Sequence, residues 1–268
     1  MQMDYILFFK TIIMGLVEGA TEFLPISSTG HLIIAGDLLG FLTKEKRDIF
    51  EIIIQLGAIL AVCWAFKQRL LDTASTLTKE AKAQHFVRNL LIAFMPAALL
   101  GLLFHHAIKQ YLFSPLTVAL ALIVGGFAIL WIERLPLKTP TQNIDDISSK
   151  QALQIGFAQA LALVPGVSRA GATILGGMLF GLNRTVATEF SFFLAIPIMF
   201  AATGYDLLKN WRLLSMDDLT VFVLGFVAAF LSALVAVKFL IRFVQTHNFI
   251  AFAWYRIIFG IIVLVWYM

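Results

Sequence analysis

Charge is scarce in this sequence. Asp, Glu, Lys and Arg make up only 13% of the 268 residues, whereas hydrophobic residues make up 60%. A soluble globular domain carries about 25% charged residues, so this chain lacks the polar surface that a domain in water needs. The single cysteine, Cys63, excludes an internal disulfide and argues against redox chemistry. No basic run is interleaved with aromatic residues, and nucleic acid is therefore not expected as a partner.

The composition instead predicts an all-α polytopic membrane protein that forms a single membrane domain over residues 1–268. The first apolar stretch has no small-residue cleavage pattern, so a cleavable signal peptide is not expected. Six apolar segments are long enough, with interfacial flanks, to cross a hydrocarbon core that needs about 20 residues. These predicted spans are Ile49–Phe66, Leu90–Phe104, Leu116–Ile132, Phe190–Tyr205, Leu219–Val237 and Phe249–Met268.

The last predicted span carries a Trp-Tyr pair near each end, Trp254-Tyr255 and Trp266-Tyr267, which is typical of aromatic belts at the two membrane interfaces. Arg256 stands beside the first pair. We expect its side chain to snorkel to the interface.

Two further apolar segments, Ile6–Gly40 and Gln151–Leu182, are too long for one span and are interrupted near the middle. Pro25 and a Ser-Ser-Thr-Gly cluster interrupt the first, and Pro165-Gly166 interrupts the second. Two ordinary spans in each segment would give ten crossings. A pair of re-entrant half-helices is the alternative that we favour, because the two broken segments resemble each other.

The resemblance rests on two short matches: Gly15-x-x-Glu18 with Gly156-x-x-Gln159, and Pro25-x-x-Ser28 with Pro165-x-x-Ser168. Each break is followed by three predicted spans, and an odd number of crossings inverts the second half relative to the first. The pattern indicates an inverted-topology repeat, with repeat one at about 1–135 and repeat two at about 150–268. The distribution of Lys and Arg between loops predicts that both termini lie outside the cell.

Ionisable residues inside a membrane segment are costly, so each is a candidate functional residue. Glu18 and Glu22 are four apart and share one face of a helix, where like charges repel unless a cation lies between them. Two carboxylates with phosphate oxygens are a usual ligand set for Mg²⁺ or Ca²⁺. A solvated acidic pair at a helix end is the alternative. Glu51 and Gln55 share a face as well, and either flank a cavity or begin an interfacial helix.

The residues after each break suit a phosphate group. Ser27 is a natural N-cap for a helix that begins near Ser28, and His31 then lies in its first turn. In the second repeat Ser168 and Arg169 fall at a helix start, with Thr173 one turn beyond. Helix N-termini bind anions, and an arginine can grip two phosphate oxygens. The alternative for Arg169 is a buried ion pair with Glu18 or Glu22.

These two motifs, Glu18-x-x-x-Glu22-x-x-Pro-x-Ser-Ser-Thr-Gly-His31 and Pro165-Gly-x-Ser168-Arg169-x-Gly-x-Thr173, resemble the signatures of the bacterial undecaprenyl-diphosphate phosphatase family, the bacitracin-resistance type. The resemblance covers the whole chain. It implies a divalent-cation-dependent enzyme of the bacterial inner membrane, with its site open to the periplasm and with bacitracin resistance on overproduction. One departure is Ala170, where the family usually has serine.

On this basis we expect hydrolysis of the phosphoanhydride of undecaprenyl diphosphate, with Glu18, Glu22, Ser28 and His31 as the catalytic group. Glu18 and Glu22 would also hold the metal. The residues expected to bind the diphosphate are Ser27, Ser168, Arg169 and Thr173. Ser28, His31 and water all stay open as the nucleophile, and a homodimer stays open too. The competing class is a polyprenyl-phosphate transporter, since many carriers share inverted repeats with broken helices. A phosphatidic-acid-type lipid phosphatase is excluded, because its histidine position is Leu175 here.

Overall fold

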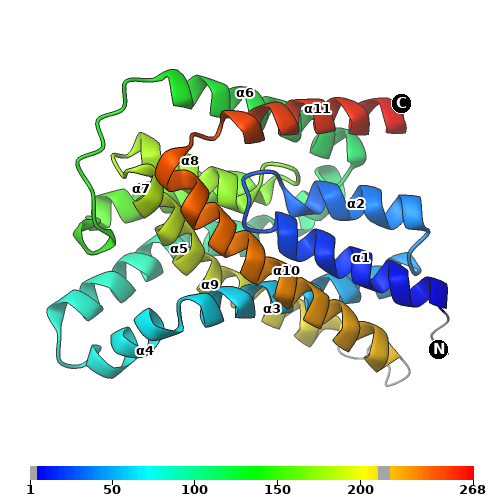
Figure 1. Ribbon diagram of the computed structural model, residues 1–268, viewed down its shortest axis with the longest axis horizontal. Coiled ribbons are helices and arrows are strands. Elements are labelled where there is room, and N and C mark those ends of the chain that lie inside the picture. Colours follow the sequence, from blue (N-terminus) through cyan, green and yellow to red (C-terminus); the bar gives the residue numbers. More distant parts are fainter. Residues whose placement is uncertain (1–4, 211–217) are drawn as a thin grey trace.

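The computed structural model describes residues 5–210 and 218–268, except for the side chains of residues 105, 106, 109 and 210. It is a bundle of helices of different lengths (Figure 1). In chain order they are α1 Tyr5–Thr21, α2 Ser28–Leu39, α3 Lys44–Ala65, α4 Lys67–Thr76, α5 Ala81–Tyr111, α6 Pro115–Arg134, η1 Ile144–Asp146, α7 Ser149–Ala160, η2 Leu161–Leu163, α8 Arg169–Leu179, α9 Arg184–Asn210, α10 Leu219–Thr246 and α11 Ile250–Tyr267.

Six of the described helices, α3, α5, α6, α9, α10 and α11, are long and apolar enough to cross a membrane. They correspond one to one to the six predicted spans, and the prediction of an all-α polytopic membrane protein is confirmed. The helices extend beyond the apolar runs at several ends because polar residues continue the helix. Helix α4 was not predicted, since its sequence is polar. It follows α3 directly, and Lys67 lies 4.6 Å from the centre of the Trp64 ring.

Both predicted breaks are present. Helix α1 ends at Thr21 and α2 begins at Ser28, so residues 22–27 form what we call the first break. In the second repeat η2 ends at Leu163 and α8 begins at Arg169, so residues 164–168 form the second break. Three helices that are long and apolar enough to cross a membrane, α3, α5 and α6, separate the two breaks, which is the odd number that the predicted inversion requires.

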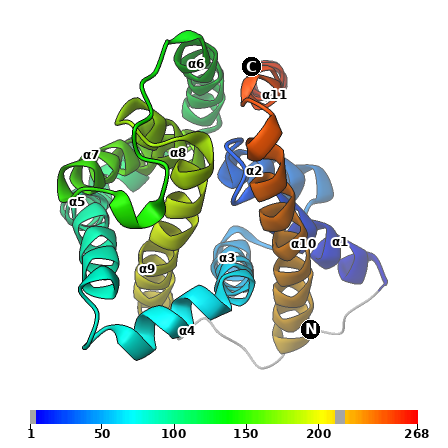
Figure 2. The same ribbon diagram turned by 60° about the vertical axis from the view of Figure 1, so that its left-hand side comes forward.

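The packing of the helices has the exchange of partners that the two predicted repeats would give. Helix α1 packs along α10 of the second repeat, and its counterpart α7 packs along α5 of the first. Close backbone approach at a glycine marks both contacts: a Cβ on Gly15 would lie 2.5 Å from the Gly225 carbonyl oxygen, and one on Gly156 would lie 2.6 Å from that of Ala93. Helices α6 and α11 pack on each other, as Figures 1 and 2 show. Two repeats related by a pseudo-two-fold axis produce this exchange of partners.

The connection between α6 and α7 is held by Asp145, whose carboxylate forms ion pairs with Arg69 and Lys82. Burial acts to raise the pKa of the Asp145 carboxyl, but the hydrogen bonds from Lys82 and Arg69 outweigh it and hold that pKa below its usual value. The two cations thereby tie this connection to α4 and to the start of α5.

Candidate active site

The two breaks share an uncommon backbone conformation. Ser27 has φ 70° and ψ 98°, and Ser168 has φ 72° and ψ 116°. A residue other than glycine at positive φ costs on the order of 1–3 kcal/mol and persists only where the surroundings impose it. Each serine directly precedes a helix, so Ser27 corresponds to Ser168 and Ser28 to Arg169.

This correspondence corrects part of the sequence match. Glu18 precedes Ser27 by as many residues as Gln159 precedes Ser168, so the match of Glu18 with Gln159 agrees with this correspondence. The match of Ser28 with Ser168 was one residue out of register, because the two prolines do not occupy equivalent places in the breaks.

The caps of the two helices differ. The Ser168 hydroxyl accepts a hydrogen bond from the Gly171 N–H at 3.1 Å, as an N-cap does. It also donates to the Leu24 carbonyl at 3.4 Å, which links the second break to the first. Ser27 is at the predicted N-cap position, but its side chain makes no capping bond, so the N–H groups that begin α2 are left without that acceptor.

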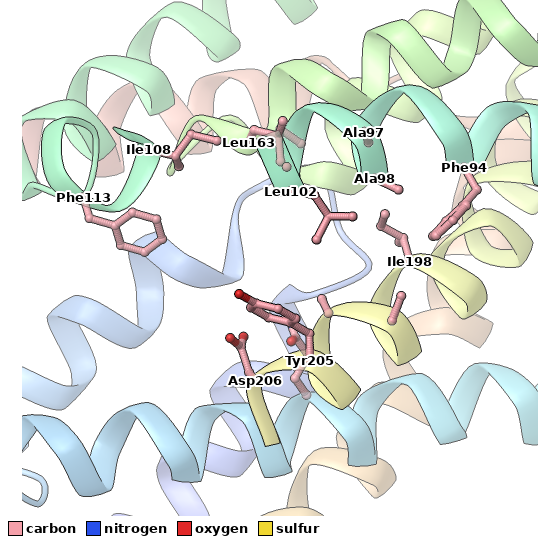
Figure 3. A pocket seen from close by; sticks show the side chains of 15 residues that line it. Phe94, Ala97, Ala98, Leu102, Ile108, Phe113, Leu163, Ile198, Tyr205 and Asp206 are labelled. Atoms are coloured by element: carbon pink, nitrogen blue, oxygen red, sulfur yellow. The ribbon is translucent and has the colours of Figure 1, made fainter. Parts of the chain in front are cut away.

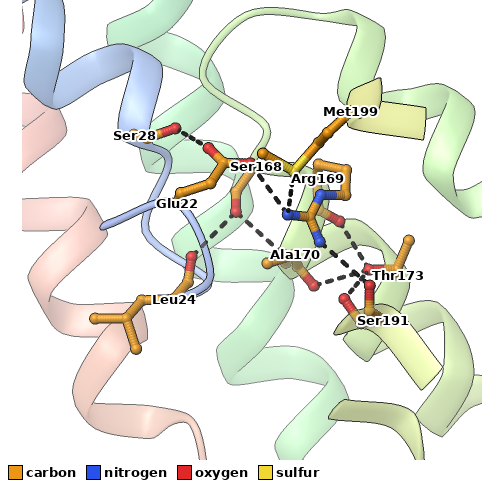
Figure 4. Close-up of polar contacts among 10 residues, drawn as sticks. Glu22, Leu24, Ser28, Ser168, Arg169, Ala170, Thr173, Ser191 and Met199 are labelled. Carbon is orange, nitrogen blue, oxygen red and sulfur yellow. Dashed lines mark hydrogen bonds and ion pairs between the residues drawn. The ribbon is translucent and has the colours of Figure 1, made fainter. Parts of the chain in front are cut away.

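A buried polar cluster joins the breaks (Figure 4). Arg169 Nη2 donates to Glu22 Oε1 at 3.0 Å, and the Ser28 hydroxyl donates a short hydrogen bond to the other oxygen of the same carboxylate. The structure thus brings Glu22, Ser28, Ser168 and Arg169 together. It also confirms the alternative reading of Arg169 as the partner of Glu22, within a cluster where helices α2 and α8 both start.

Helix α9 supplies two contacts that the sequence did not indicate. Arg169 Nη1 donates to the Ser191 carbonyl at 3.3 Å, and Nη2 lies 3.5 Å from Met199 Sδ. The hydroxyls of Thr173 and Ser191 are 2.6 Å apart, and the Thr173 hydroxyl is also within hydrogen-bond distance of the Arg169 carbonyl. Ser191 lies in the phenylalanine-rich run of residues 190–193, a pattern more typical of packing or lipid-facing surface than of a site. A small polar residue in that run was the available signal.

Two buried polar atoms of predicted site residues have no hydrogen-bond partner among the described residues: Glu18 Oε2 and Arg169 Nε. The Glu18 side chain is 1% exposed and lies one helical turn before Glu22. An unpaired carboxylate oxygen beside a second carboxylate requires a proton or a cation, so the residues present fit a divalent ion. No group of three or more His, Cys, Asp or Glu is present in the part of the chain that the structure describes, so further ligands would come from substrate or water.

Gln159, the counterpart of Glu18 in the second repeat, is also buried. Both of its side-chain polar atoms lack a partner within residues 5–210 and 218–268.

His31 lies in the first turn of α2, as predicted, but its ring faces α11. Nδ1 is 2.8 Å from the Ser27 carbonyl and Nε2 is 2.6 Å from the Tyr255 hydroxyl. Since a carbonyl can only accept, Nδ1 carries the proton, and in the neutral ring Nε2 accepts from Tyr255. The ring also stacks on Phe259, with centroids 4.2 Å apart. Among the described residues, the hydrogen bonds of the His31 ring are thus to Ser27 and Tyr255, and not to Glu22 or Ser28.

The prediction that Arg256 snorkels to the interface is wrong. Its side chain is 1% exposed and lies between the two breaks. It donates to five carbonyl oxygens, those of Ala121 (3.1 Å), Leu122 (3.3 Å), Pro25 (3.1 Å), Gly166 (3.0 Å) and Val167 (2.9 Å). Pro25 and Gly166 occupy corresponding positions in the first and second breaks. The neighbouring aromatic pair suggested an interface, but the carbonyls of two non-helical segments inside the membrane need donors, and the guanidinium supplies them.

A cavity of about 460 Å³ lies between α5, α9, η2 and α3, and Figure 3 shows its lining. Gln55 of α3 and Leu163 of η2 lie in its wall, together with Ile198 of α9. Of the pair Glu51 and Gln55, which was expected to flank the cavity of the site or begin an interfacial helix, Gln55 lines this cavity and Glu51 is not among its lining residues.

Nearly the whole chain is similar to one protein family. Residues 11–262 match the family model of bacitracin resistance protein BacA. The chain belongs to this family. An undecaprenyl-diphosphatase of Nitrosospira multiformis is 60% identical over 263 residues, which cover 98% of this chain and 96% of the relative. That of Methylobacillus flagellatus is 60% identical over 270 residues, covering 99% of this chain and 100% of the relative. An undecaprenyl-diphosphatase 2 of Rhodospirillum rubrum is 58% identical over 98% of this chain and 96% of the relative.

In this member of the bacitracin resistance family, Ala170 is fully buried and belongs to the main hydrophobic cluster. Its methyl group therefore packs in the core. The polar contacts of Arg169 and Ser168 are made without a hydroxyl at position 170.

Proposed function

We propose that this chain hydrolyses undecaprenyl diphosphate to undecaprenyl phosphate and inorganic phosphate. The observation that carries the proposal is the contact of Arg169 with the Glu22–Ser28 pair at two facing helix starts. The diphosphatase names of relatives about 60% identical support it. Those names give no support to the transporter alternative.

The diphosphate would bind between the starts of α2 and α8. Arg169 offers a buried Nε that lacks a partner among the described residues, and it can exchange its bond to Glu22 for a phosphate oxygen. Ser168 and the N–H groups at the start of α2 would add neutral donors, with the positive ends of the helix dipoles. Two of the predicted binding residues would act on the diphosphate indirectly. Ser27 leaves the N–H groups of α2 free of a side-chain cap, and Thr173 orients Arg169 through a hydrogen bond to the Arg169 carbonyl.

The hydrogen bond from Ser28 to Glu22 favours Ser28 as the nucleophile. Its oxygen would attack the terminal phosphorus while its proton passes to Glu22, and the bond between phosphorus and the bridging oxygen would break to release undecaprenyl phosphate. Water would then cleave the phosphoserine, give up a proton, and return Ser28 with inorganic phosphate. His31 would serve as acid–base in this second step once its Nε2 exchanges Tyr255 for water.

Glu18 and Glu22 would hold a divalent cation, Mg²⁺ or Ca²⁺. The cation would neutralise charge on the diphosphate, where electrostatic stabilisation dominates phosphoryl transfer. Glu22 would then bind the cation through one carboxylate oxygen and accept the proton of Ser28 on the other.

The protein is a multi-pass membrane protein. We place it in the bacterial inner membrane with the site open to the periplasm, and a homodimer is compatible with this arrangement. Overproduction would give bacitracin resistance.

The direct test measures phosphate released from undecaprenyl diphosphate by detergent-purified protein, with and without a chelator. We expect turnover that stops on chelation and returns with Mg²⁺ or Ca²⁺. Full turnover after exhaustive chelation would remove the cation from the mechanism, and no turnover at all would refute the proposed function. Ser28→Ala should abolish release, whereas Thr29→Ala, which removes an adjacent hydroxyl outside the polar cluster, should retain it. Phosphate trapped on Ser28 after rapid acid quenching would identify the nucleophile.

A further inference from the structure

The Arg169 guanidinium lies over the face of an aromatic ring. Its central carbon, Cζ, is 5.4 Å from the centre of the Phe23 ring, within the distance of about 6 Å at which a cation and an aromatic face attract each other. Phe23 follows Glu22 in the first break and is fully buried. Two consecutive residues of the first half therefore contact the same guanidinium, Glu22 through its carboxylate and Phe23 through its ring.

Helix α9 holds this arrangement from the second half of the chain. The Phe23 ring packs edge to face with Phe192, with centroids 5.7 Å apart and ring planes at 89°. Ser191, the preceding residue, accepts a hydrogen bond from Arg169 Nη1 on its carbonyl oxygen at 3.3 Å (Figure 4). The Ser191 hydroxyl lies 2.6 Å from that of Thr173. Ser191 and Phe192 are both fully buried, so one turn of α9 holds both the ring and the guanidinium.

The contacts with Phe23 and Ser191 differ in charge from the ion pair with Glu22. A ring face and a carbonyl oxygen attract a cation but carry no net charge, so they leave the positive charge of Arg169 available to an anion. The Glu22 carboxylate neutralises that charge and competes with a phosphate for Nη2. When a phosphate displaces Glu22, the ring of Phe23 and the carbonyl of Ser191 still hold the guanidinium and oppose its rotation.

We propose that Phe23 is a positioning residue of the diphosphate site. Its ring face stabilises the orientation of the Arg169 guanidinium in which Nε and Nη2 are both available to phosphate oxygens. Without the ring, orientations in which the guanidinium follows Glu22 become populated. The affinity for phosphate then falls with the fraction of molecules that keep the competent orientation. The inference rests on the proposed function, because Phe23 acts only through the phosphate that Arg169 binds.

The test changes the electron density of the ring face with little change in ring size. Phe23 is replaced by 4-fluoro-, 3,5-difluoro- and 3,4,5-trifluorophenylalanine, in which each fluorine withdraws further density from the face. Phosphate release from undecaprenyl diphosphate is measured for each purified protein. The value of kcat/KM should fall stepwise with the number of fluorines, to about one tenth of wild type, because loss of a desolvated cation–π contact makes the competent orientation the minor one. Phe23→Leu, which removes the ring, should lose at least as much.

Phe50 is the matched control, because it is equally buried and packs on Phe41 in a different hydrophobic cluster, with ring centroids 4.8 Å apart. The same fluorinated series at Phe50 should leave kcat/KM unchanged. Equal losses at both positions would show a general effect of fluorination. Values within about twofold of wild type throughout the series at position 23 would show that Phe23 acts by packing alone. Both results overturn the inference while the proposed function stands.

A second measurement does not depend on turnover. In calorimetric titration with inorganic diphosphate, the dissociation constant should rise in the same order across the series at position 23. An unchanged dissociation constant, or no binding to wild type, contradicts the positioning of an anion-binding arginine. Binding that weakens with each fluorine in a protein that releases no phosphate from undecaprenyl diphosphate would support the role of Phe23 and refute the proposed function.

Discussion

Replacing Arg169 by lysine keeps the positive charge at the start of α8 but removes the planar fork of donors. The guanidinium uses Nη1 for the Ser191 carbonyl at 3.3 Å, while Nε and, after exchange of the 3.0 Å bond to Glu22, Nη2 are available to the substrate. A lysine nitrogen at one of these positions cannot reach the other two. We therefore expect Arg169→Lys to lose at least two contacts when substrate is bound.

A hydrogen bond that involves a charged group contributes about 1.5–3 kcal/mol. Loss of two such contacts therefore weakens binding of the transition state by about 3 kcal/mol or more. Because each 1.36 kcal/mol changes the rate tenfold, kcat/KM should fall by at least about 100-fold. The fall should be larger in kcat if the Nε contact strengthens as charge develops on the phosphate.

The assay is phosphate release by purified variants at matched protein concentration, with thermal unfolding measured alongside. Arg134→Lys is the matched control, since Arg134 is an exposed arginine at the end of α6. A value for Arg169→Lys within about threefold of wild type would refute the reasoning and reduce Arg169 to a structural partner of Glu22.

Three further predictions concern the fold. Arg256→Gln loses most of the five carbonyl contacts of Arg256, and each buried acceptor left unpaired costs about 1–3 kcal/mol. The Tm in detergent should therefore fall markedly. An unchanged Tm would contradict the role of Arg256 in joining the two breaks. In a Cys63→Ala background, Lys44→Cys should react with an impermeant thiol reagent on intact cells, and Lys150→Cys only after permeabilisation. Reaction of both on intact cells would contradict the inversion of the halves. Asp145→Asn should lower the Tm at pH 7. Since the folded-state pKa of Asp145 is depressed, its stabilisation is present above about pH 4 and is lost as the pH falls further. If the Tm difference between Asp145→Asn and wild type does not shrink on acidification, the Asp145 carboxylate is not the source of the stabilisation.

Hydropathy and helix breakers were sufficient to predict the six spans and the two breaks, because both are local properties of the sequence. The same holds for the cluster of Glu22 and Ser28, which are close in the chain. Arg169 could be assigned to the same site only through the inverted repeat, which sequence similarity indicated although one of its two matches was out of register.

Other features depend on contacts between distant segments. Ser191 joins the site because α9 packs against α8, and nothing near Ser191 in the sequence indicates that partner. The orientation of His31 toward Tyr255 depends in the same way on α11. For Arg256 a rule was available, since a charged residue inside a span is functional by default. The adjacent aromatic residues led to the opposite interpretation.

The register between the breaks has a consequence for how such a site can be built at all. Residues at corresponding positions differ where chemistry is proposed: Ser28 stands opposite Arg169, and Glu18 opposite Gln159. In an assembly of two identical subunits about a two-fold axis, both subunits present the same surface to the site. Every side chain of such a site is therefore present twice. A dimer of the second half would carry two copies of Arg169 and neither Glu18 nor Glu22. A dimer of the first half would place four carboxylates around one diphosphate. Because the two halves are joined in a single chain, the first half can carry the carboxylates and the Ser28 hydroxyl while the second carries the Arg169 guanidinium.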